Sequence, residues 1–135
     1  MKAKTEHDRP LEGLRILIAE DEFLISVALE DTLREAGAEI VTAPNVRVAL
    51  EDIAGQTLSG ALLDVRLGRQ TTDCVADSLE ALGIPFLFYS GHGLPEGMRD
   101  KHPGAEVLLK PVTPRAVIDA VLAMVKRAKG QPSPA

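Results

Sequence analysis

The sequence predicts an α/β fold in which a doubly wound, five-stranded parallel sheet carries helices on both faces. Three observations lead to this fold class. Short runs of apolar, often β-branched residues alternate with longer segments whose apolar residues recur at helical spacing. Most residues of the short runs are apolar, as in strands that are buried on both faces. Gly, Asn and Pro separate the segments and mark helix starts and stops.

Five apolar runs predict the strands. They cover residues 14–19, 40–42, 61–65, 85–89 and 107–109. Pro85 stands at the first position of the fourth run, where its missing N–H removes no hydrogen bond from the sheet. Because parallel neighbours need crossover connections, the segments between the strands should be right-handed helical crossovers.

The apolar spacing between the strands predicts four clear helices. They cover residues 24–36, 46–53, 75–82 and 114–125. Gly37 and Gly83 follow two of them as stop signals, and Asn45 and Thr113 are suited to cap the starts of two others. Pro114 fits the first helical position. Between the fourth and fifth strands, residues 94–104 contain two Pro and two Gly. The fourth helix is therefore expected to be short or poorly ordered.

Length and composition predict one domain over residues 11–128, with residues 1–10 and 129–135 as flexible tails. The hydrophobic fraction of 45% and charged fraction of 26% are typical of a soluble globular protein. Of the net charge of −5, residues 11–125 carry −9, so direct nucleic-acid binding is disfavoured. No apolar run is long enough for a membrane span. A single cysteine suits a reducing, cytoplasmic location.

Chemically active residues follow four of the predicted strands. Ligands of doubly wound sheets bind outside the carboxyl ends of the strands. Those positions hold the acids Glu20, Asp21 and Asp64, followed along the chain by Ser90 and Lys110. Carboxylates that lie this close raise one another's pKa unless a cation neutralises them. Mg²⁺ is the preferred partner of such oxygen ligands, and acids with a lysine around Mg²⁺ suit phosphoryl transfer.

On these residues the chain resembles a response-regulator receiver domain over nearly all of residues 13–127. The resemblance implies the strand order 2-1-3-4-5 and phosphorylation of Asp64 by a histidine kinase. It also implies that Asp21, Asp64 and the backbone carbonyl of Arg66 bind Mg²⁺, while Glu20 holds a metal-bound water. Ser90 and Lys110 would contact the phosphoryl oxygens.

Two departures from the usual receiver pattern point to a subfamily. Val107 stands three residues before the lysine, where receivers usually carry Tyr or Phe, and residues 66–70 replace the usual Met-Pro-rich loop. With the stretch at residues 85–93, these departures resemble the FATGUY receivers. That resemblance implies a stand-alone receiver that works with histidine kinases of the HWE or HisKA_2 type and signals through protein contacts. Such a receiver would assist its own phosphorylation and dephosphorylation and would not be a turnover enzyme.

Several alternatives remain. The domain could be a pseudo-receiver that never carries phosphate, or an aspartate-nucleophile phosphatase, although Arg66 occupies the position of that family's second acid. Lys110-Pro111 could be a plain turn with a cis peptide bond. The remaining residues of interest are assigned no role at the site. The core is expected to contain Cys74, Phe86, Phe88 and Tyr89. His92 is expected in solvent, and His7 and His102 are expected to have no ligand-like neighbours.

Overall fold

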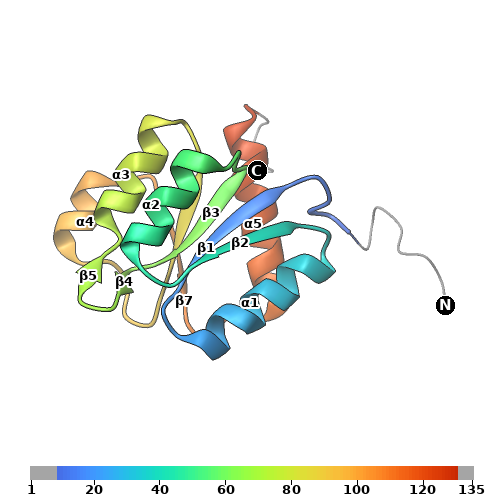
Figure 1. Ribbon diagram of the computed structural model, residues 1–135, viewed down its shortest axis with the longest axis horizontal. Coiled ribbons are helices and arrows are strands. Elements are labelled where there is room, and N and C mark those ends of the chain that lie inside the picture. Colours follow the sequence, from blue (N-terminus) through green and yellow to red (C-terminus); the bar gives the residue numbers. More distant parts are fainter. Residues whose placement is uncertain (1–8, 131–135) are drawn as a thin grey trace.

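A five-stranded parallel sheet in the order β2-β1-β3-β6-β7 forms the centre of the fold (Figure 1). Its strands are β1 (Arg15–Ala19), β2 (Glu39–Ala43), β3 (Gly60–Asp64), β6 (Phe86–Ser90) and β7 (Glu106–Leu109). Counted along the chain, this is the predicted order 2-1-3-4-5. The computed structural model describes residues 9–130, so most of the predicted tails lies outside the described residues.

The helices cover both faces of the sheet, as predicted (Figure 1). They are α1 (Phe23–Glu35), α2 (Val46–Gly55), α3 (Asp73–Ala81), α4 (Glu96–Lys101) and α5 (Pro114–Ala128). Buried residues of α2, α3 and α4 form one half of the core and those of α1 and α5 the other half. Strand residues alternate between these halves, because successive side chains of a strand point to opposite faces. Neither half of the core is complete without the sheet.

The predicted helix caps are confirmed. The Oδ1 atom of Asn45 accepts a hydrogen bond from the Val48 amide at 2.9 Å, and the Oγ1 atom of Thr113 accepts one from Ala116 at 3.1 Å. Gly37, after α1, has a φ of 107°. A Cβ atom there would lie 2.9 Å from the Glu12 amide nitrogen, so both the conformation and the space require glycine.

Three sequence-based assignments need correction. Residues 66–71 form a small antiparallel hairpin, β4 (Arg66–Leu67) and β5 (Gln70–Thr71), where no strand was predicted. Cys74 is exposed and not part of the core, because it lies on the outer side of α3. His102 is 3% exposed and has three acidic neighbours, so its expected lack of ligand-like neighbours is wrong.

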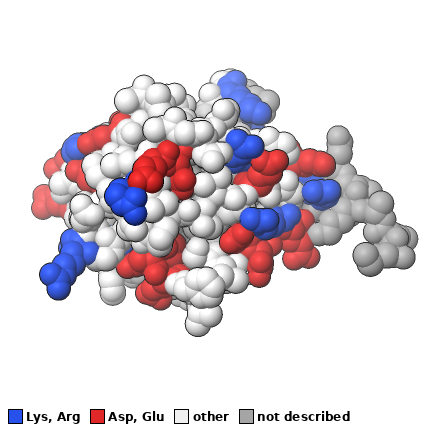
Figure 2. Space-filling model, in the orientation of Figure 1, with Lys and Arg blue, Asp and Glu red and all other residues white. Residues whose placement is uncertain are grey.

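The fourth helix is short, as predicted, with six residues. It is nevertheless anchored to the rest of the domain, since Leu94 and Met98 are buried in the same half of the core as α2 and α3. No helix among the described residues is long and apolar enough to cross a membrane. The face drawn in Figure 2 intersperses acidic and basic side chains, without a continuous basic surface.

Candidate functional site

Four neighbouring strands end at the same edge of the sheet and bring the predicted site residues together. Glu20 and Asp21 follow β1, Asp64 is the last residue of β3, Ser90 is the last residue of β6, and Lys110 follows β7. Since β1, β3, β6 and β7 are consecutive in the sheet, these positions adjoin one another. The strand order therefore assembles the site from residues up to 90 positions apart in the sequence.

Lys110 is the central cation of this site. Its Nζ atom lies 3.1 Å from Oδ2 of Asp64 and 3.7 Å from Oε1 of Glu20. Burial disfavours the charged ammonium, but the hydrogen bond to Asp64 and the charge of Glu20 outweigh it and raise the pKa of Lys110. The Lys110 amide donates to the Ser90 carbonyl at 2.8 Å, and the Lys110–Pro111 peptide bond is cis. The backbone thus holds the lysine against the end of β6.

Glu20 is the most deeply buried acid of the site. It is 3% exposed, and neither of its carboxylate oxygens forms a hydrogen bond within the described part of the chain. Burial, together with the neighbouring Asp64, raises the pKa of Glu20 to about 8. Oxygens of Glu20, Asp21 and Asp64 lie within 4.8 Å of one another. These three carboxylates, one of them buried and without a hydrogen bond, form a donor set that fits a hard divalent cation such as Mg²⁺.

The unpredicted hairpin closes one side of the acidic group. The Gly68 amide, in the turn between β4 and β5, donates to Oδ2 of Asp21 at 2.9 Å, and the Arg66 amide lies 3.5 Å from Oδ1 of Asp64. Gly68 has a φ of 63°. The available sequence signal was this glycine, because Gly at the first of two turn residues is typical of tight hairpins.

Ser90 begins a loop that borders a cavity of about 530 Å³ next to Asp64. Its Oγ atom accepts a hydrogen bond from the His92 amide and donates one to the Gly93 carbonyl, both at 3.1 Å. Arg66, His92 and Lys110 also line the cavity, so His92 does border the site although it is solvent-exposed. The cavity gives a group that approaches Asp64 access from solvent.

Tyr89 is a site neighbour that the sequence analysis assigned to the core alone. It is buried among residues of α1 and α5, and its ring also lies below the Lys110 ammonium, with 4.9 Å between Nζ and the ring centroid. Val107, at the position where receivers usually carry an aromatic residue, packs instead against the α2–α3 half of the core. The aromatic contact of the site lysine therefore comes from β6.

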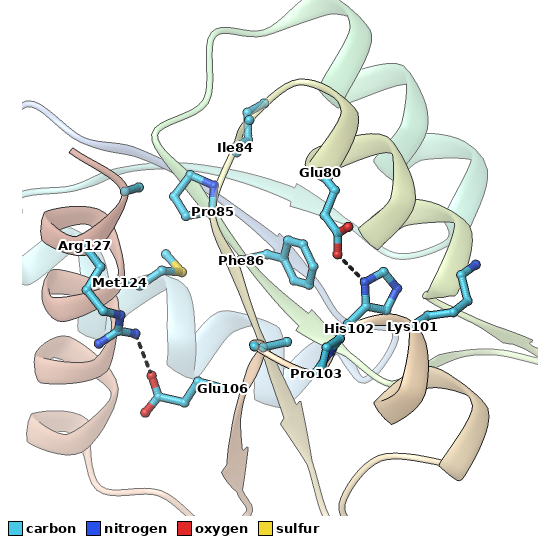
Figure 3. A pocket seen from close by; sticks show the side chains of 14 residues that line it. Glu80, Ile84, Pro85, Phe86, Lys101, His102, Pro103, Glu106, Met124 and Arg127 are labelled. Atoms are coloured by element: carbon cyan, nitrogen blue, oxygen red, sulfur yellow. Dashed lines mark hydrogen bonds and ion pairs between the residues drawn. The ribbon is translucent and has the colours of Figure 1, made fainter. Parts of the chain in front are cut away.

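A second titratable group lies at the end of α4, beside a cavity of about 540 Å³ (Figure 3). The His102 ring bonds to Glu80 through Nδ1 and lies 3.1 Å from Oδ1 of Asp73 through Nε2. Lys101 Nζ bridges Asp73 and Asp77 at 3.1 and 2.8 Å. Lys101 and His102 of the α4 end contact three acids of α3, so this group ties α4 to α3.

Comparisons with known proteins agree with the geometry. No protein-family model matches the chain. The chain is 30% identical over 122 residues to the response regulator protein TodT of Pseudomonas putida. The match covers 87% of this chain and 54% of TodT. The chain thus spans about half the length of this curated relative.

Solved structures give the same result. A response regulator receiver protein from Sinorhizobium medicae superposes with a TM-score of 0.78 and 27% identity, over 87% of this chain and 98% of that one. The receiver domain of a sensor histidine kinase from Pseudomonas aeruginosa, with a magnesium ion coordinated in its active site cleft, superposes with a TM-score of 0.73 and 20% identity, over 84% and 98% of the two chains. The chain is therefore similar in sequence to a response regulator and shares the fold of solved response-regulator receiver domains.

Proposed function

We propose that Asp64 accepts a phosphoryl group from the phosphohistidine of a histidine kinase, in a reaction that needs Mg²⁺. The observation that carries this proposal is the contact of 3.1 Å between Asp64 and Lys110, beside a buried Glu20 that has no hydrogen-bond partner. Phosphoryl transfer depends on positioning and on charge neutralisation, and this group of residues supplies both.

In the proposed step, a carboxylate oxygen of Asp64 attacks the phosphorus atom. A P–O bond forms and the P–N bond to histidine breaks, and its electron pair remains on the imidazole nitrogen, which solvent protonates. The Lys110 ammonium compensates the additional negative charge on the acyl phosphate. The Ser90 hydroxyl, which borders the cavity beside Asp64, would receive a phosphoryl oxygen in place of its bond to Gly93.

We assign Mg²⁺ to the acidic group, with Asp21, Asp64 and the backbone carbonyl of Arg66 as direct ligands. Glu20 would hold a metal-bound water. When bound, the ion would neutralise charge that develops on the transferred group. Two observations support this assignment. The buried Glu20 oxygens have no hydrogen bond within the described part of the chain, and the three carboxylates lie close together. The receiver from Pseudomonas aeruginosa, with magnesium in its active site cleft, adds a precedent in the same fold.

The proposal extends to partners and to the kind of output. We infer that the domain belongs to the FATGUY receivers, receives its phosphate from a kinase of the HWE or HisKA_2 type, and acts alone in the cytoplasm through protein contacts. Val107 and the replaced loop at residues 66–70 support the subfamily. The domain assists its own phosphorylation and is not a turnover enzyme.

The proposal is tested by incubating the protein with acetyl phosphate and Mg²⁺ and following the intact mass. The parent protein should gain one phosphoryl group, and omission of Mg²⁺ should abolish the gain. Asp64→Asn should fold and remain unmodified, whereas Asp31→Asn, an exposed acid on α1, should behave as the parent does. Equal modification of the Asp64 variant and the parent would reject the assignment.

The same experiment separates the alternatives. A pseudo-receiver would show no mass gain in any condition, while its fold would match the parent fold. An aspartate-nucleophile phosphatase would release phosphate from many small phosphate esters with repeated turnover. The proposed receiver should be modified by acetyl phosphate but should not hydrolyse such esters.

A further inference from the structure

We propose that Tyr89 positions the Lys110 ammonium through its aromatic face, an inference that rests on the proposed phosphorylation of Asp64. Tyr89 is paired in register with Asp64 on one side and with Leu108 on the other. It therefore lies between the phosphoacceptor strand and the strand that leads to the lysine. Its ring centroid is 4.9 Å from Nζ of Lys110.

The contact has the geometry and burial of a cation–π interaction. An ammonium within about 6 Å of a ring centroid is attracted by the negative face of the ring, more strongly when the pair is shielded from water. Tyr89 is 8% exposed, and the Lys110 side chain is 21% exposed. The lysine thus has three attractive neighbours, namely Asp64, Glu20 and the ring.

The ring differs from the two carboxylates in what it does to the lysine. Lys110 has a long, flexible side chain, and carboxylates attract its ammonium from many directions. The ring of Tyr89 is fixed by packing between α1 and α5, so it supplies one rigid surface below the ammonium. A rigid support of this kind keeps Nζ at the strand ends while the charge on Asp64 changes.

The hydroxyl group of Tyr89 has no part in this role. It forms no hydrogen bond to another described residue, and the residue borders a small cavity of about 280 Å³ between α1 and α5. A leucine is apolar and would keep part of the packing at this position, but it would offer the ammonium no negative face. The inference therefore predicts that phenylalanine replaces Tyr89 without loss and that leucine does not.

The first measurement is made on the unmodified protein and needs no phosphoryl transfer. The ε-methylene protons of Lys110 should show an upfield ring-current shift by NMR in the parent and in Tyr89→Phe. The shift should disappear in Tyr89→Leu. Persistence of the parent shift in Tyr89→Leu would overturn the contact itself.

The second measurement is the initial rate of modification by acetyl phosphate at saturating Mg²⁺. Tyr89→Leu should react about fivefold more slowly than the parent, from the strength of a partly desolvated cation–π contact, while Tyr89→Phe should match the parent. Phe86→Leu is the matched control, because it removes a ring from the same strand on the opposite face. Equal rates in the parent and Tyr89→Leu, or slowing in the Phe86 control alone, would refute the positioning role.

Replacement of Tyr89 by phenylalanine analogues with increasing fluorine content tests the ring face without a change of shape, even if Tyr89→Leu does not fold. The rate should fall as fluorination weakens the negative face, and a flat series would overturn the proposal. Absence of any modification of the parent would instead reject the proposed function. In that case the NMR shift still decides whether the ring holds the lysine.

Discussion

The buried His102 should stabilise the domain through its charge, and His102→Phe tests this directly. Phenylalanine keeps a flat ring against Phe86 and Phe88, whose centroids lie 5.7 and 6.1 Å from the His102 ring. It removes the ring nitrogens that contact Glu80 and Asp73. The substitution therefore separates the electrostatic contribution of the histidine from its packing.

The size of the effect follows from these contacts. Hydrogen bonds to charged groups contribute about 1.5–3 kcal/mol. The acids of α3 are partly solvated, with side-chain exposures of 32% for Asp73 and 50% for Glu80, which favours the lower end of that range. A loss of about 2 kcal/mol in the free energy of unfolding lowers the melting temperature of a domain of this size by about 6–10 °C.

The contribution should depend on pH in a defined direction. Burial disfavours the imidazolium, but Glu80 and Asp73 outweigh it and raise the pKa of His102. The stabilisation is then complete below the usual histidine pKa of about 6.5 and is lost as the pH rises through the raised value. Burial alone would raise the pKa of Asp73, but its contacts with His102 and Lys101 lower it. The stabilisation from the contact between His102 and Asp73 is therefore lost at acidic pH, as the pH falls through that lowered value. The facing groups are Asp73, Asp77 and Glu80 from α3 and Lys101 from α4, while β6 offers only uncharged rings.

The assay is urea unfolding of the parent and of His102→Phe between pH 5 and pH 9. The difference between the two proteins should be largest near pH 5–6 and should shrink at higher pH. Taking the difference cancels the contribution of titrating groups that do not contact His102. Lys101→Gln is the control, since it removes an exposed cation from Asp73 and Asp77 and should have a much smaller effect. A difference that stays constant with pH would refute the electrostatic role.

Three further predictions concern single residues. Because the pKa of Glu20 is raised to about 8, the metal-free protein should lose stability as the pH rises from about 4.5 to 8. Calorimetry in a chelator should show that Glu20→Gln removes this loss. Titration with Mg²⁺ should show weaker binding by the same variant. Gly37→Ala should cost about 1–3 kcal/mol in urea unfolding, since φ is 107° and the new Cβ meets Glu12; no loss would contradict the close approach. Asn45→Ala should cost about 1 kcal/mol by the same measurement, because the α2 cap is lost, while Asn45→Asp should retain most of the stability.

The main elements of the fold were predictable because they carry periodic signals. Each of the five strands of the main sheet contains a continuous apolar run, and the long helices repeat their apolar residues at helical spacing. The hairpin at residues 66–71 was missed because strands of two residues have no measurable period. The exposure of Cys74 was missed for a related reason, since its neighbours Val75 and Ala76 are buried and the helix turns Cys74 away from them.

The site was partly predictable for a different reason. Parallel strands place their carboxyl ends at one edge, so an acid after β1, an acid at the end of β3 and a lysine after β7 had to be near one another. The contacts of His102 with α3 and of Gly68 with Asp21 join residues 22 to 47 positions apart. No local pattern encodes such pairs, because they depend on how helices and loops pack against the finished sheet.

The alternation of β6 also limits how the length of this chain can change during evolution. Phe86 and Phe88 pack on the α2–α3 side, whereas Leu87 and Tyr89 pack on the α1–α5 side. A codon inserted between Leu87 and Phe88 would exchange the two sides and move the ring of Tyr89 away from Lys110. An insertion near Gly83, in the connection before the strand, leaves the alternation intact. Descendants of this gene should therefore vary in length in the crossover loops, while the spacing within the strands that end at the site is inherited unchanged.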